Sequence, residues 1–159
     1  MKRNRIAKKD WELVVDYACK IVNASSRKDR VAGKAHNAAL HSYLKRLLRK
    51  YGPRAAIVET QGDFTGNCRQ RLSLYKRAYS LAEEQADYYT LASSSVSLAE
   101  IYIEDMRDRK NASIWLMKLK SVLNGHPDED FAEKYATLSK MIKKSSRRKR
   151  PPRRRKQLS

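Results

Sequence analysis

The chain has few residues that interrupt helices or favour sheets. Its 159 residues include five Gly and four Pro, and its β-branched residues are sparse and scattered, which argues against a sheet. No apolar run approaches the ~18 residues that a membrane-spanning helix needs, and the basic N-terminus is not followed by the apolar stretch of a secretory signal. Cys19 and Cys68 are the only cysteines and form neither a metal-binding spacing nor a redox motif. The composition therefore predicts an all-α protein without membrane insertion.

The sequence also lacks the clustered side chains that catalysis or metal binding needs. Among its three histidines, His36 and His41 are five positions apart, so they do not form the i, i+4 pair of a helical metal site. His126 stands alone in an expected turn. The acidic run 128–130 begins an expected helix, where carboxylates complement the helix dipole. We therefore expect no enzyme activity, no metal and no cofactor.

Acidic residues are missing from both ends of the chain. The net charge is +19, from 36 Lys and Arg against 17 Asp and Glu. Five of the basic residues lie in 1–9 and ten in 143–159, which leaves 21 against 17, a net charge of +4, for 10–142. We expect 1–9 to be a flexible basic arm and 144–159 a disordered basic tail, because like charges at this density repel. The tail residues predicted to bind nucleic acid or another polyanion are Arg147, Arg148, Lys149, Arg150, Arg153, Arg154, Arg155 and Lys156.

Between the basic ends, apolar residues recur at the spacing of amphipathic helices. The pattern predicts about seven helices, at roughly 10–24, 29–51, 53–61, 66–86, 88–106, 111–123 and 128–144. The residues predicted to mark helix ends by capping, turn or proline chemistry are Asp10, Gly52, Pro53, Gly62, Asp63, Thr65 or Asn67, and Asn111.

An internal repeat relates the later helices at an offset of 41 positions. The offset places Leu74, Tyr75, Ala78 and Leu81 on Trp115, Leu116, Leu119 and Val122. A constant offset of this size is typical of stacked helix pairs. We therefore predict antiparallel pairs at 53–86 and 88–124, with the helix at 128–143 as a polar cap on a helical domain spanning 10–143.

The repeat resembles the tetratricopeptide (TPR) family in a longer form. Leu98-Ala99 resembles the Leu-Gly position of that family, Tyr102 matches its following aromatic residue, and Ala112 and Leu116 keep the spacing of its second helix. Ser95 departs from the family pattern, which has Trp there. The resemblance covers about 53–127; an unrelated helical bundle with a chance repeat is the alternative.

The resemblance implies helix pairs stacked as a short right-handed superhelix, which binds a protein or peptide in a concave groove. The groove residues implied by register are Glu59, Ser93, Val96 and Glu100. The leading interpretation is a non-catalytic adaptor with basic ends that contact nucleic acid or another polyanion, in the cytoplasm or, in a eukaryote, the nucleus. The alternative is a nucleic-acid-binding protein whose helical body is the main surface. That surface would include Lys45, Arg46, Arg49 and Lys50. Partner identity and oligomeric state stay open.

Overall fold

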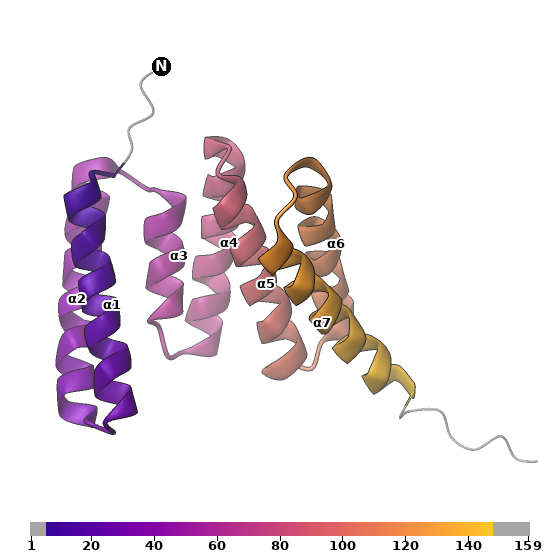
Figure 1. Ribbon diagram of the computed structural model, residues 1–159, viewed down its shortest axis with the longest axis horizontal. Helices are drawn as coiled ribbons and strands as arrows, with labels where there is room; N and C mark the ends of the chain where they lie inside the picture. The colour runs from indigo at the N-terminus through magenta and orange to yellow at the C-terminus, as the bar shows by residue number, and fades with distance from the viewer. Residues whose placement is uncertain (1–5, 148–159) are drawn as a thin grey trace, which may run out of the picture. The chain divides into compact units, whose positions relative to one another are not determined.

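The computed structural model describes the backbone of residues 6–147 and the side chains of residues 6–144. Within this range the chain forms seven helices and no strand (Figure 1). This confirms the predicted all-α fold. The helices are α1 (Lys8–Ser26), α2 (Arg30–Tyr51), α3 (Ala55–Asp63), α4 (Cys68–Gln85), α5 (Tyr88–Glu104), α6 (Arg109–Gly125) and α7 (Glu129–Arg147).

The chain divides into two compact units, Met1–Ser94 and Ser95–Ser159, and the division falls within α5. In the first unit, α1 packs against α2, α2 against α3, and α3 against α4. In the second unit, α6 packs against α7. Short turns join α1 to α2, α3 to α4 and α6 to α7, so each of these pairs is antiparallel (Figure 1).

The core of the first unit joins α1, α2 and α3. Leu40, Leu44 and Leu47 recur at helical spacing along α2 and are at most 1% exposed. They bury one face of α2 because apolar area removed from water stabilises the fold by roughly 25 cal/mol per Å². The buried cluster consists of Val14, Leu40, Tyr43, Leu44, Leu47 and Ile57.

Several helix ends follow the sequence prediction. Asn67, one of the two predicted candidates, caps α4 by accepting a hydrogen bond from the Gln70 N–H at 3.0 Å. Asp29 caps α2 in the same way, by accepting from the Ala32 N–H, although no cap was predicted there. Gly52 follows α2 with a φ of 73°, a conformation that glycine adopts without a steric cost. Capping and turn chemistry is local, so it can be predicted from a short stretch of sequence.

The prediction that Asp10 caps α1 is wrong. The helix begins two residues earlier, and Ala7 is at the N-cap position. The Asp10 carboxylate is buried and accepts hydrogen bonds from Tyr43 and Tyr51 of α2. A carboxylate satisfied by these distant partners is not available to cap its own helix.

Three other predicted boundaries also differ. Pro53 does not open α3, which has Arg54 at its N-cap. Gly62 lies inside α3, which ends at Asp63, and the Tyr75 ring packs over it, 3.0 Å from where a Cβ would stand. Asn111 does not cap α6. Asp108 does, by accepting from the Asn111 N–H at 3.1 Å.

The helix predicted to end near 143 or 144 continues to Arg147, so the first residues assigned to the tail are helical. The remaining predicted tail and the first five residues of the predicted arm lie outside the described range. Along residues 6–147, no helix combines the length and the apolar character needed to cross a membrane.

Candidate functional site

Helix α2 carries six Lys or Arg residues and no Asp or Glu. All six basic side chains are exposed. Helix α6 also lacks acidic residues but carries four Lys or Arg, so α2 has the larger positive charge of the two. The basic residues of α2 are Arg30, Lys34, Lys45, Arg46, Arg49 and Lys50.

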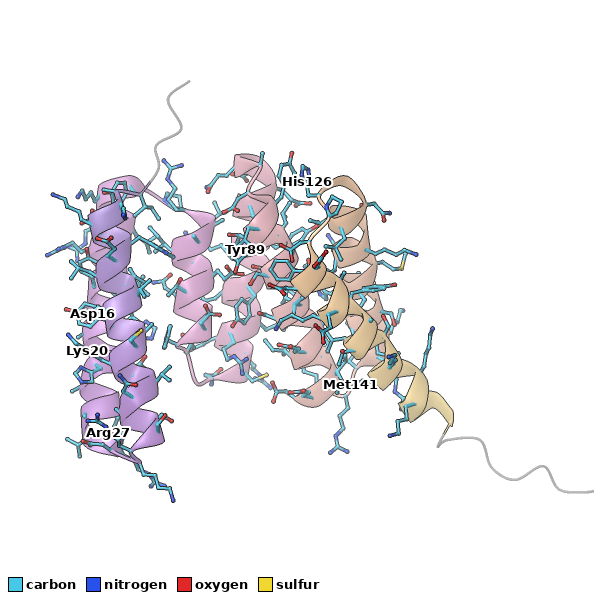
Figure 2. The ribbon with its side chains drawn as sticks, viewed as in Figure 1. Asp16, Lys20, Arg27, Tyr89, His126 and Met141 are labelled. Carbon is cyan, nitrogen blue, oxygen red and sulfur yellow. The ribbon has the colours of Figure 1, made fainter. Side chains whose placement is uncertain are left out.

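Four of these residues share one side of the helix. At 3.6 residues per turn, Arg30, Lys34, Lys45 and Arg49 fall within about 100° of the helix circumference. We call these four residues the α2 basic face. Among the described residues, none of the four has a carboxylate partner. By contrast, Lys20 of α1 lies beside Asp16 in an ion pair of 2.7 Å (Figure 2).

The other two basic residues of α2 make contacts within the protein. The Arg46 guanidinium lies 4.8 Å from the centre of the Tyr43 ring, a cation–π contact. Lys50 Nζ lies 2.6 Å from Asp10 Oδ2, and Tyr51 donates to the same oxygen at 2.6 Å. The hydrogen bonds from Lys50 and Tyr51 lower the pKa of Asp10 to about 2.

These contacts divide the basic residues predicted from sequence into two groups. Lys45 and Arg49 keep side chains without a carboxylate partner in the described chain, whereas Lys50 already neutralises Asp10. The sequence analysis missed Arg30 and Lys34. The four-residue spacing between them, in a helix without acids, is the signal that could have identified them.

A cavity of about 870 Å³ lies at the N-terminal end of α2. The end of α1 and the turn between α3 and α4 form its other walls. We call it the α2 cavity. Arg30 and Lys34 line the α2 cavity and are also part of the α2 basic face. The remaining lining residues that bear on its chemistry are Ala24, Lys28, Asp29, Gly33, Asn37, Asp63 and Phe64.

The groove residues implied by the repeat are not equally accessible. Glu59 is 8% exposed and Val96 is 4% exposed, so neither side chain is placed to contact a partner. Ser93 and Glu100 are partly exposed. Glu100 also lines a pocket of about 510 Å³ together with residues of α7.

Glu59 is a buried carboxyl group with a protein partner. Ser94 Oγ donates a hydrogen bond to Glu59 Oε1 at 2.9 Å. Burial raises the pKa of Glu59 to about 7, because removal from water disfavours the charged form, and the Ser94 hydrogen bond only partly opposes this. The position of Glu59 is therefore explained by internal packing.

The predicted tail contacts cannot be placed on the fold. Arg147 is the last residue of α7, and its side chain lies outside the described set. Arg148, Lys149, Arg150, Arg153, Arg154, Arg155 and Lys156 lie outside the described residues altogether.

The histidines are not gathered into a site. A ring nitrogen of His41 lies 3.0 Å from the Phe64 carbonyl oxygen, an interaction that ties α2 to the turn after α3. In the part of the chain that the structure describes, no three His, Cys, Asp or Glu side chains are grouped to hold a metal ion.

Comparison with protein-family models, with curated proteins and with solved structures found no match to this chain.

Proposed function

We propose that this chain is a nucleic-acid-binding protein whose helical body contacts the phosphate backbone through the α2 basic face. The observation that supports this function is the presence of six exposed basic side chains and no acid on a single helix. Lys and Arg placed along a helix neutralise phosphates and release their counterions, which drives binding. We extend the proposal to the basic residues at both ends of the chain, which add positive charge to the same molecule.

The side chains of the α2 basic face suit this role better than the other basic residues of the helix. Lys50 would have to give up Asp10 in order to bind a phosphate, whereas Lys45 and Arg49 lose no ion pair in the described chain. An exposed cation without a partner gains the full attraction of a phosphate. The α2 basic face is therefore expected to contribute more to the affinity than Arg46 and Lys50 do.

Salt-dependent binding tests the proposal. We would measure the affinity of the full chain for a labelled single strand by fluorescence anisotropy between ~50 and ~200 mM salt. Each lost phosphate contact lowers the slope of log K against log[salt] by about 0.7 for a single strand. Replacing both Lys45 and Arg49 by Gln should therefore reduce the slope by about 1.4 and weaken binding at every salt concentration.

The matched control removes two charges from another helix. Lys110 and Lys120 of α6 are exposed, and their replacement by Gln changes the net charge by the same amount. The proposal predicts a smaller effect for this pair. Equal effects of the two double variants would show that net charge, and not the α2 basic face, determines binding. Absence of binding at ~50 mM salt would overturn the proposed function.

A second candidate function is protein binding by the second unit, as a helical-repeat adaptor. It is favoured by two apolar side chains one turn apart on α6, Ile114 at 43% and Met117 at 72% exposed. Exposed apolar groups of this kind occur at protein contact sites. If they form such a site, the full chain should retain a protein partner that the Met117→Glu variant loses. A partner retained equally by both would exclude this surface.

A further inference from the structure

The α2 cavity is large enough for an organic ligand. Its volume of about 870 Å³ lies within the range of ~300–1,000 Å³ that is common for ligand sites. Ala24 and Phe64 give it an apolar wall, while Asn37 and Asp63 give it hydrogen-bonding groups. A mixed lining of this kind suits a flat molecule with polar edges.

Gly33 is the residue without a side chain in the α2 part of the cavity lining. It lies in the second turn of α2, where glycine costs roughly 1 kcal/mol relative to alanine. A Cβ at this position would meet only the Ala24 Cβ, at 3.8 Å, which is an ordinary van der Waals contact. No positive φ requires this glycine. Gly33 and Ala24 both line the cavity, so a side chain longer than alanine at position 33 would extend into the cavity or against Ala24.

Asn37 gives the cavity a buried polar group that the protein itself does not satisfy. Its side-chain oxygen is buried and has no hydrogen-bond partner among the described residues. Such groups are rare because an unpaired buried acceptor costs free energy. Asn37 lines the cavity, and a ligand there can supply the missing N–H donor once the amide turns about its last torsion and brings this oxygen to the cavity.

The cavity lining carries charges of both signs. The basic residues Lys28, Arg30 and Lys34 are exposed at the cavity, and two of them continue into the α2 basic face. Asp29, Asp63 and Asn37 contribute oxygen acceptors to the lining. Carboxylates repel phosphate but accept hydrogen bonds from the amino groups of nucleobases. The expected ligand therefore combines an N–H-rich neutral ring with flanking phosphates.

We propose that the α2 cavity receives one unstacked base of a single-stranded nucleic acid, while the adjoining phosphates lie along the α2 basic face. This inference rests on the proposed function and specifies its ligand. A base inside a duplex is stacked and paired and cannot enter the cavity. Bases with an exocyclic amino group, such as cytosine, are preferred because the lining supplies acceptors.

The test compares ligands of equal charge. We would measure binding of the full chain to labelled oligo(dC) of about 12 nucleotides, to a strand of the same length with abasic sites, and to the duplex. We expect oligo(dC) to bind about tenfold more tightly than the abasic strand, because stacking and hydrogen bonding of one base are of that order. An RNA strand of the same sequence distinguishes RNA from DNA as the preferred ligand.

Two variants then connect the base preference to the cavity. Gly33→Leu fills the cavity and should abolish the tenfold advantage while leaving binding of the abasic strand unchanged. Asn37→Leu removes the unpaired amide and should lower the advantage about fivefold without loss of thermal stability. Ala35→Leu is the matched control, since Ala35 is exposed on α2 and is not part of the cavity lining.

The outcomes separate the inference from the proposed function. Equal binding of oligo(dC) and the abasic strand, with strong salt dependence, would overturn the base-binding cavity and leave the α2 basic face intact. A base advantage that survives in Gly33→Leu would also overturn it, because the base would then bind elsewhere. If none of the strands binds at ~50 mM salt, both proposals fail.

Discussion

Replacing Glu59 by Gln should stabilise the protein at alkaline pH and leave it unchanged at acidic pH. Glu59 is 8% exposed, and burial raises its pKa from a usual value near 4.5 to about 7. The folded state therefore holds a proton that the unfolded chain releases as the pH rises between these values. Unfolding becomes more favourable through that window, because the unfolded state binds fewer protons than the folded state.

The size of the effect follows from the two pKa values. One pKa unit corresponds to about 1.4 kcal/mol, so the wild type should lose about 3 kcal/mol of unfolding free energy between pH 4 and pH 8 through this group. Glutamine carries no titratable proton and can still accept the hydrogen bond from Ser94. The Glu59→Gln variant should therefore be more stable than the wild type by up to about 3 kcal/mol at pH 8.

Urea unfolding at pH 4, 6 and 8 measures this difference through the midpoint and slope of each transition. The exposed Glu84→Gln variant of α4 serves as a control and should stay within about 0.5 kcal/mol of the wild type. A Glu59→Gln variant that is less stable than the wild type by the same amount at every pH would refute the reasoning. Glu59 would then be charged in the folded state, with the Ser94 hydrogen bond outweighing desolvation.

Two further substitutions test contacts within the first unit. Asp10→Asn should destabilise the protein at neutral pH because it weakens the ion pair with Lys50. Hydrogen bonding lowers the folded-state pKa of Asp10 to about 2. The difference in unfolding free energy between the wild type and Asp10→Asn, measured from unfolding curves, should therefore shrink as the pH falls from about 4 toward 2. A difference that stays constant over this range would exclude an ionised Asp10. Gly62→Ala should lower the unfolding free energy by about 1–2 kcal/mol, because the new Cβ would lie 3.0 Å from the ring of Tyr75, whose hydroxyl is fixed by a hydrogen bond to Asp63. A more stable Gly62→Ala variant in thermal unfolding would show that helix propensity outweighs this contact.

The helices could be predicted from sequence because their causes are local. Leu40, Leu44 and Leu47 lie on one face at helical spacing, and their burial requires no knowledge of a partner. The helix ends were predicted where capping is local, as at Asn67. They were missed at Asp10 and Gly62, whose environments are set by residues 13 to 41 positions away along the chain.

The candidate site could be predicted only in part, for the same reason. The sequence shows that Lys45, Arg46, Arg49 and Lys50 are close together, but not that Lys50 is paired with a carboxylate 40 positions earlier. The α2 cavity requires the end of α1 and the turn after α3 to meet beside Asn37. No short sequence pattern encodes that meeting.

Two buried polar groups, the Glu59 carboxyl and the Asn37 side-chain oxygen, break the usual rules of packing, and the difference between them decides where a ligand is expected. Glu59 has a hydrogen-bond partner in Ser94, and its pKa of about 7 allows it to take up a proton near neutral pH. Internal packing therefore accounts for it, and no ligand is needed. Asn37 has no partner for its buried oxygen in the described chain, and an amide cannot gain or lose a proton to relieve the cost. Because exceptions to consistent packing concentrate at functional sites, the expected binding site lies at Asn37 and the α2 cavity and not at Glu59 in the predicted groove.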